Sequence, residues 1–283
     1  MSLSIFTSMT NPEERGDPWK EALNCYNQVA DEVVVVGDDW PHNFSWDYIG
    51  KTFQEGYDKC SSDWVIRMDI DYFFHQNDIL NLRKALTKYD DFPALAFPQY
   101  QIFTPDRYQI KTRICLAFNK KVYKNIKLNG GGDLTLATLD NKLLDPKKVP
   151  NINIPIYQYE STFKTKEIIA SDRARFASAW INYFGTVDDR GGHSPEEAYN
   201  AWLSMVKERY PKHNFKLKIE EHPIYVQNKI KELDHEQFGY DAFGLKKGLK
   251  IDYIYHLKGM REKYFNPIQL SKYKQINYYD SLG

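Results

Sequence analysis

The run EVVVVGDD, residues 32–39, constrains the fold more than any other segment of this chain. Consecutive β-branched residues favour a strand, and an apolar run without alternation is typical of a central parallel strand covered on both faces. Residues 3–8 (LSIFTS) are predicted to form a shorter buried strand. Between the two, DPWKEALNCYNQVADE begins with Asp-Pro and has helical spacing. Strand, helix and strand form a βαβ unit, which predicts an α/β fold.

The same pattern continues along the chain. Helical spacing recurs at residues 46–60 and 77–89, and strand-like composition at 63–68, 94–103 and 110–118. Pro98 indicates that its strand is an edge strand or contains a bulge. We expect a Rossmann-like, mostly parallel sheet flanked by helices over residues 1–160. Residues 161–283 have three stretches of helical spacing, at 166–184, 195–210 and 223–233, and are expected to form a mostly helical extension packed on that domain.

Composition excludes several classes of protein. The 283 residues carry 38 Lys+Arg and 38 Asp+Glu, and this balance argues against binding nucleic acid through a basic surface. Cys25, Cys60 and Cys115 are too few and too widely spaced for a disulfide framework or a zinc site. The N-terminus lacks a signal-peptide pattern, and no apolar run is long enough to span a membrane. We therefore expect a cytoplasmic protein without a transmembrane segment.

The segment KKGLKIDYIYHLKGMREKYF, residues 246–265, is basic and aromatic. We interpret it as a helix with a solvated face. Peripheral contact with a membrane surface or with an acidic partner is the alternative.

The sequence DWVIRMDID, residues 63–71, is the sharpest functional signal. It places Asp69 and Asp71 at the carboxyl end of a predicted strand, where open α/β sheets bind ligands. Two carboxylates in this position could share Mg²⁺ or Mn²⁺, which takes its remaining ligands from substrate phosphates and water. Two acids solvated at the end of a strand are the alternative interpretation.

Other residues are expected at the same edge of the sheet. Asp38 and Asp39 end the second strand, where a carboxylate could accept a hydrogen bond from a base N–H or a ribose hydroxyl. The loop after the first strand runs from Thr7 to Arg15, and Arg15 could meet a diphosphate or lie exposed. Trp40 and Trp46 could stack on a ring, although core packing is the default interpretation.

These residues together resemble a GT-A glycosyltransferase of the large family 2 type, over roughly residues 1–120. In that pattern a strand ends in paired acids, here Asp38 and Asp39. A helix with Asn-x-Gly follows, here Gln54-Glu55-Gly56, and then a strand ending in Asp-x-Asp, here residues 69–71.

The resemblance implies a nucleotide-sugar donor. Asp38 or Asp39 would contact its base or ribose, with Thr7, Arg15, Gln54 and Asp69 also at the donor site. Asp71, with or without Asp69, would hold the Mn²⁺ or Mg²⁺ that neutralises charge on the leaving diphosphate. The acceptor would be a hydroxyl of a glycan, lipid or protein, and inversion at the anomeric carbon is expected through the resemblance.

Inverting transfer needs a base that deprotonates the acceptor hydroxyl. Asp133 is the candidate, because the three glycines before it permit close approach of a ligand. A glycine turn with an exposed aspartate is the alternative, and Glu160 is the second candidate base.

The chain departs from the family pattern at three places. Tyr72 follows the Asp-x-Asp, Gln54 replaces the usual Asn, and Gln158 stands where many relatives carry a late metal-binding histidine. His222 and His193 are possible substitutes, although a lone histidine beside proline is more often structural.

Two basic stretches could bind a diphosphate or an anionic acceptor, or could pair with the abundant acids instead. They contain Arg107, Lys111 and Arg113, and Arg173 and Arg175.

Three other functions compete with the transferase. A nucleotidyltransferase of the sugar-activating kind expects a Gly-rich basic loop after the first strand, and an Asp-x-Asp phosphatase expects its motif there. The loop TNPEERGDP fits the nucleotidyltransferase poorly. The phosphatase fits poorly because the Asp-x-Asp follows the third strand, with Phe73 where a Thr or Val is expected. A non-catalytic sugar- or nucleotide-binding protein on a degenerate GT-A fold is the other alternative.

Overall fold

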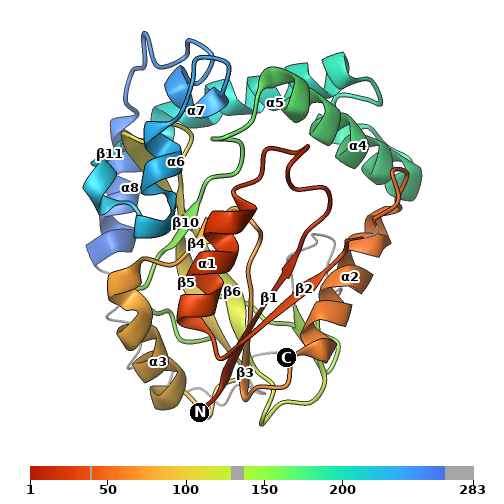
Figure 1. The fold of residues 1–283 in the computed structure, drawn as a ribbon, viewed down its shortest axis with the longest axis vertical. Helices are drawn as coiled ribbons and strands as arrows, with labels where there is room; N and C mark the ends of the chain where they lie inside the picture. The colour runs from red at the N-terminus through yellow and green to blue at the C-terminus, as the bar shows by residue number, and fades with distance from the viewer. Residues whose placement is uncertain (39, 129–136, 265–283) are drawn as a thin grey trace.

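A mixed β-sheet forms the centre of the computed structural model, which describes residues 1–38, 40–128 and 137–264 (Figure 1). Over these residues the sheet has eight strands, in the order β2-β1-β3-β6-β5-β10-β4 with β11 against β6. Strands β2, β1, β3, β5 and β10 run in one direction, whereas β6 and β4 run in the other. The expected α/β fold with a mostly parallel sheet is confirmed. The strands are β1 (Leu3–Ser8), β2 (Glu32–Val36), β3 (Trp64–Arg67), β4 (Tyr72–Phe73), β5 (Ala94–Gln101), β6 (Arg107–Asn119), β10 (Ile156–Gln158) and β11 (Phe215–Lys216).

Helices cover both faces of this sheet (Figure 1). On one face α1 (Trp19–Val29) and α3 (Ile79–Lys88) pack over a core that contains Ile5 of β1. On the other face α2 (Trp46–Lys59) packs over Phe6 of the same strand. Because successive strand residues point to opposite faces, the pair Ile5 and Phe6 supplies two separate cores.

Gly56 allows α2 to approach the sheet closely. A Cβ at this position would lie 2.4 Å from a carbon of the Phe6 ring, so only glycine fits without displacing the aromatic side chain. The glycine of the Gln54-Glu55-Gly56 sequence therefore serves helix–strand packing in this structure.

Strand β2 lies at the edge of the sheet, and the prediction of a central strand is wrong. Within the described residues it pairs with β1 alone, and Val35 is 38% exposed. Val33 and Val34 still pack against the two cores on opposite faces. The apolar run thus reports coverage of both faces, which does not depend on whether a strand has one neighbour or two.

Pro98 lies in a central strand and marks a bulge. β5 is fully buried between β6 and β10, and its pairing with β6 shifts register between Phe97 and Gln99. The bulge prediction is confirmed and the edge-strand alternative is wrong. Proline has no N–H to donate to the neighbouring strand, and the bulge places it where the regular pairing is interrupted.

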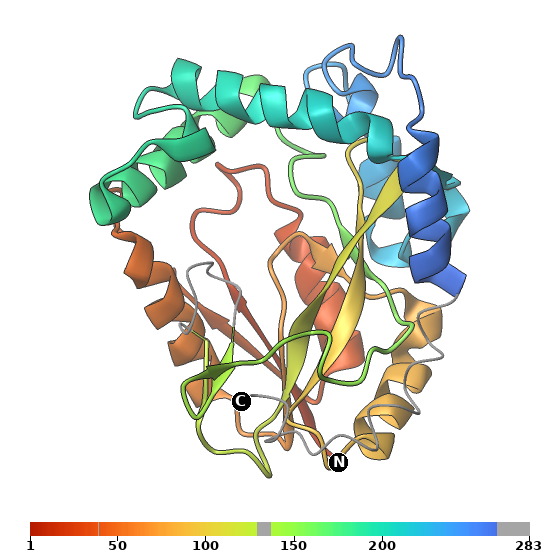
Figure 2. The ribbon, with the colours of Figure 1, turned by 180° about the vertical axis from the view of Figure 1, so that it is seen from behind.

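The chain after residue 160 is mostly helical. α4 (Lys166–Phe184) begins at a Thr165 cap, and α5 (Pro195–Arg209) at a capping box made by Ser194 and Glu197. Figure 2 shows these helices extending over one end of the sheet. The remaining helices are α6 (Gln227–Lys231), α7 (Phe238–Asp241) and α8 (Tyr253–Tyr264). β11 also comes from this part of the chain, so the extension contributes a strand to the central sheet.

Smaller elements complete the described chain, in which no helix is long and apolar enough to cross a membrane. Three short strands form a second sheet: β7 (Ile126–Lys127), β8 (Thr138–Leu139) and β9 (Lys142–Leu143). The 3₁₀ turns are η1 (Gln76–Asp78), η2 (Asp188–Arg190), η3 (Tyr210–Lys212), η4 (Ile219–Glu221) and η5 (Ile224–Val226).

Candidate functional site

A pocket of about 470 Å³ lies where the loops after β1 and β3 meet the segment after β10 and helices α2 and α4. These are the carboxyl ends of three strands that run in the same direction, the usual ligand position in such sheets. Of the residues singled out in the sequence, the pocket brings together Arg15, Asp69, Asp71, Glu160, Arg173, Trp40 and Trp46.

The backbone of the Asp-x-Asp turn is fixed from two sides. The Tyr26 hydroxyl, on α1, lies 2.6 Å from the Asp69 carbonyl oxygen and 3.0 Å from that of Tyr72. The Tyr159 N–H donates to the Asp71 carbonyl oxygen at 3.0 Å. Because Tyr26 is fully buried, the turn is anchored to the core although its carboxylates face the pocket.

The two aspartates differ in their partners. The Asp69 carboxylate accepts a hydrogen bond from Arg67 Nη1 at 2.7 Å. The Asp71 carboxylate has neither a hydrogen bond nor an ion pair within the described residues. Burial, and then the nearby charges of Asp69, Asp17 and Glu160, raise the pKa of Asp71 to about 7. A cation bound beside Asp71 would relieve this repulsion.

Arg67 is unusual for an arginine because it is only 2% exposed. Its guanidinium lies 4.8 Å from the Phe53 ring centre, and its Nε and Nη2 have no hydrogen-bond partner among the described residues. It holds Asp69 from within the pocket wall. We did not identify Arg67 from the sequence, although a charge inside the apolar strand WVIR was a visible signal.

Glu160 is held in an ion pair. Its carboxylate lies 2.5 Å from Arg173 Nη2 and accepts a hydrogen bond from Gln101 Nε2 at 2.8 Å. Burial raises the pKa of this carboxyl, but the charges of Arg173 and Lys111 outweigh it and lower the pKa to about 2. Such a weak base does not suit proton abstraction near neutral pH, so the structure does not favour Glu160 as the alternative catalytic base.

Four charged side chains form a second network in the pocket wall. Lys164 Nζ lies 2.8 Å from Asp17 and 2.7 Å from Asp172, and Arg15 lies 3.0 and 3.3 Å from the same two carboxylates. The network joins the loop after β1 to helix α4. Lys164, Asp17 and Asp172 were missed in the sequence because their separation along the chain gives no local pattern.

The aromatic side of the pocket comes from α2 and its preceding loop. Trp46 stacks edge-on against Trp180 with ring centres 5.0 Å apart, and Arg190 lies 5.2 and 4.4 Å from these two rings. Trp40 packs edge-on against Phe44. Both predicted tryptophans line the pocket while packing against other rings.

Four further predicted donor-site residues do not line the pocket. Thr7 is buried behind it, next to the lining residue Ser8, and Asp38 lies exposed after β2. Arg107 pairs with Asp106, while Lys111 acts on Glu160 only through its charge.

The prediction of Gln54 as a donor-site residue is corrected, because Gln54 lies on the outer side of α2 and does not line the pocket. Its side chain donates to Asp58 and accepts from the Leu128 N–H, which ties the helix to the residue directly after β7. Asp39 and Asp133 lie outside the described residues.

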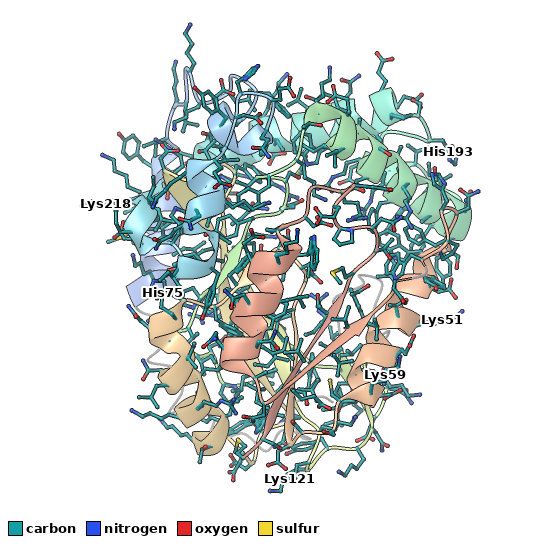
Figure 3. The ribbon with its side chains drawn as sticks, in the orientation of Figure 1. Lys51, Lys59, His75, Lys121, His193 and Lys218 are labelled. Atoms are coloured by element: carbon teal, nitrogen blue, oxygen red, sulfur yellow. The ribbon has the colours of Figure 1, made fainter. Side chains whose placement is uncertain are left out.

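The metal-ligand prediction for His222 is also corrected. His222 Nε2 must donate to the Pro105 carbonyl oxygen, 2.8 Å away, so Nδ1 accepts from the Tyr159 hydroxyl at 2.7 Å. Both ring nitrogens are therefore occupied, and His222 does not line the pocket. His193 is exposed at the periphery and bonds Ser178 (Figure 3). Gln158 is buried and donates to Gln99 at 2.6 Å, so it too is structural.

A metal ion in this pocket would have only a few ligands from the protein. Among the described residues, no group of three or more His, Cys, Asp or Glu side chains has the arrangement of a metal site. Asp71, with a partnerless carboxylate and a raised pKa, still fits a site whose other ligands come from a phosphate and water.

Fold and pocket thus define an α/β protein with a charged ligand pocket at the carboxyl ends of its strands. No family model matches the chain, and no curated protein matches it. Among solved structures it is similar to Staphylococcus aureus TarS. That structure is 12% identical with a TM-score of 0.31, and the match covers 74% of this chain and 44% of the TarS chain. The chain therefore spans less than half of that protein.

Two further structures contain TarS residues 1–349. The structure without UDP-GlcNAc is 13% identical to this chain, with a TM-score of 0.30. The structure of the complex with UDP-GlcNAc is 12% identical, with a TM-score of 0.35. Both matches cover 97% of this chain and 92% of the other. At these identities and TM-scores the likeness carries no functional argument.

Proposed function

We propose that this chain is a GT-A-type glycosyltransferase that moves a sugar from a nucleoside-diphosphate sugar to a hydroxyl acceptor. The observation that carries the proposal is Asp71. Its partnerless carboxylate lines a pocket that also contains the cationic side chains of Arg15, Lys164 and Arg173. Acids for a metal beside cations for a diphosphate are the combination that such a donor requires.

Mn²⁺ or Mg²⁺ would be held by Asp71, with Asp69 as the second ligand and diphosphate oxygens and water completing the shell. Bound there, the ion would neutralise the charge that develops on the leaving diphosphate. Arg67 keeps Asp69 oriented toward the pocket through their ion pair. Arg15 and Lys164, already fixed by Asp17 and Asp172, would place positive charge beside the diphosphate.

Asp133 remains the proposed base for an inverting transfer, on the strength of the sequence alone. A non-catalytic nucleotide- or sugar-binding protein is the second candidate. It is favoured by the ion pair of Glu160 with Arg173, which leaves that described carboxylate unsuited to accept a proton.

Turnover of nucleotide sugars tests the proposal. Release of UDP, GDP or dTDP from the corresponding sugar donors, with water or small glycosides as acceptor and with Mn²⁺ present, is expected for the folded protein. Asp71→Asn should lose at least about 100-fold of this rate, as when a group that stabilises the transition state is removed.

Asp91→Asn, at an exposed acid outside the pocket, is the matched control and should keep the rate. Nucleotide binding without release would favour the binding protein, and equal rates for both variants would exclude Asp71 from the reaction.

A further inference from the structure

Helix α8 has two chemically distinct faces. Its inner face packs on the central sheet: His256 stacks on Phe215 with ring centres 5.0 Å apart, and Lys263 Nζ lies 3.1 Å from the Tyr108 hydroxyl. Gly259 lies against the same Phe215 ring. At about 100° per residue these positions fall within one arc of the helix. The inner face fixes α8 firmly on β6 and β11 at the periphery of the molecule (Figure 2).

The outer face points away from this contact and is apolar at its centre. Ile254 is 68% exposed and Leu257 is 70% exposed, and Tyr253 beside them is 75% exposed. Scattered single apolar residues are normal on a protein surface, but here they adjoin on one helix face. They share that face with Lys258 and Arg261, which follow Ile254 at helical spacing.

The segment that leads into α8 and forms it is basic, although the whole chain has zero net charge. Lys246 pairs with Asp106, and Lys263 belongs to the inner face. The other cations of this segment are exposed: Lys247 and Lys250 before the helix, and Lys258 and Arg261 on it. The segment from residue 246 to residue 263 contains only Asp252 and Glu262 as acids.

We propose that the outer face of α8 docks on an anionic lipid surface. When a helix adsorbs in the plane of a membrane, its apolar side chains enter the acyl boundary and its long cationic side chains reach the headgroups. Tyr253 suits the interface because its ring is apolar and its hydroxyl polar. The proposal does not rest on the glycosyltransferase activity.

A second copy of the chain fits this face less well. In a two-fold contact the same cations would face each other, and the exposed apolar side chains would cover far less than the roughly 800 Å² per partner of a standard interface. An acidic protein would satisfy the cations but does not by itself require Ile254 and Leu257 to be exposed. The combination of both features favours lipid.

Vesicle co-sedimentation of the full chain tests the proposal. We expect binding to phosphatidylcholine vesicles that contain phosphatidylglycerol, weaker binding at raised ionic strength, and little binding to phosphatidylcholine alone. Leu257→Asp should lower partitioning at least about tenfold, because it removes an exposed leucine that the bilayer would bury and adds a charge of the same sign as the anionic lipid. Lys258→Glu with Arg261→Glu should lower it on the anionic vesicles.

Leu80→Asp is the matched control, because Leu80 is 65% exposed on α3 and far from α8 in sequence. It should bind vesicles like the parent chain. Failure of the parent chain to bind, or equal loss in Leu80→Asp and Leu257→Asp, would overturn the proposal. A dimer in solution that Leu257→Asp dissociates would assign the face to a second copy instead. A fall in Tm for Leu257→Asp without vesicle binding would assign it to the chain's own residues 265–283.

Discussion

The hydroxyl of Tyr26 lies 2.6 Å from the carbonyl oxygen of Asp69, so a fully buried residue of α1 holds the turn that presents the pocket carboxylates. The same hydroxyl lies 3.0 Å from the Tyr72 carbonyl oxygen. The Asp-x-Asp turn is therefore anchored by the first βαβ unit as well as by its own strand.

Tyr26→Phe should lower the free energy of unfolding by about 1–3 kcal/mol, because the carbonyl oxygens of Asp69 and Tyr72 lose the one hydroxyl that they share. Urea denaturation measures the change. Tyr89→Phe is the control: Tyr89 is also buried, and no hydrogen bond of its hydroxyl is found within the described chain. Equal effects of the two substitutions would show that the Tyr26 hydroxyl does not hold the turn.

Lys120→Met should destabilise the fold by about 1–3 kcal/mol. Lys120 Nζ donates to the carbonyl oxygens of Tyr57, Asp58 and Cys60 at 2.8, 3.0 and 2.7 Å, and it thereby closes the end of α2. Lys121→Met is the neighbouring control, with an expected change within about 1 kcal/mol, since Lys121 is exposed (Figure 3) and lies 3.8 Å from Asp63. The two midpoints in urea should separate clearly; coincident midpoints would contradict the role of Lys120.

Gly56→Ala tests the close approach of α2 to β1. In an open helix this change would stabilise by about 0.5–1 kcal/mol, but here the new methyl meets the Phe6 ring at 2.4 Å. Overpacking should dominate and cost about 1–3 kcal/mol. Glu55→Ala, at the adjacent exposed position, should stay within about 0.5 kcal/mol. A Tm for Gly56→Ala at or above that of the parent chain would be incompatible with this packing.

Buried His222 should make the fold sensitive to acid. Burial lowers its pKa from the ordinary 6.5 to about 4. Between these values the unfolded chain binds the proton and the folded chain does not, so this contribution is complete above pH 6.5. It is lost as the pH falls toward 4, by at most about 1.4 kcal/mol per pH unit.

His222→Gln removes that dependence, and exposed His193→Gln is its control. The difference between variant and parent isolates His222 from Asp71, whose raised pKa acts with the opposite sign between pH 3.8 and about 7. Unfolding free energies from pH 4 to 8 should give a smaller slope for His222→Gln alone. An unchanged slope would mean that His222 titrates normally.

Local patterns in the sequence were enough to predict the order of the main elements. Period and composition depend on neighbouring residues, so α1, α2 and β3 appear where expected. Edge or central position depends on distant pairing, and β2 was therefore misplaced. The same distinction holds in the pocket. Asp69 and Asp71 can be recognised from a local motif at the end of a predicted strand. The contact of Asp17 with Lys164 has no such motif, because these residues are 147 positions apart in the chain and meet only on folding.

Burial also decides roles that residue type leaves open. Glu160 and His222 were both chemically reasonable candidates in the sequence. In the folded chain the Glu160 carboxylate forms an ion pair with Arg173, and the two ring nitrogens of His222 form hydrogen bonds with Tyr159 and Pro105. No pattern in neighbouring residues reports these partners.

The most direct test of the proposed donor site is the change in Tm caused by UDP, GDP, CMP, dTDP and UDP-GlcNAc with and without Mn²⁺. A ligand that binds only the folded state must raise Tm. We predict that a diphosphate ligand raises Tm when Mn²⁺ is present, that Asp71→Asn abolishes the increase, and that Asp91→Asn retains it. A shift of the same size in Asp71→Asn, or no shift with any ligand, would contradict a metal–nucleotide site at Asp71.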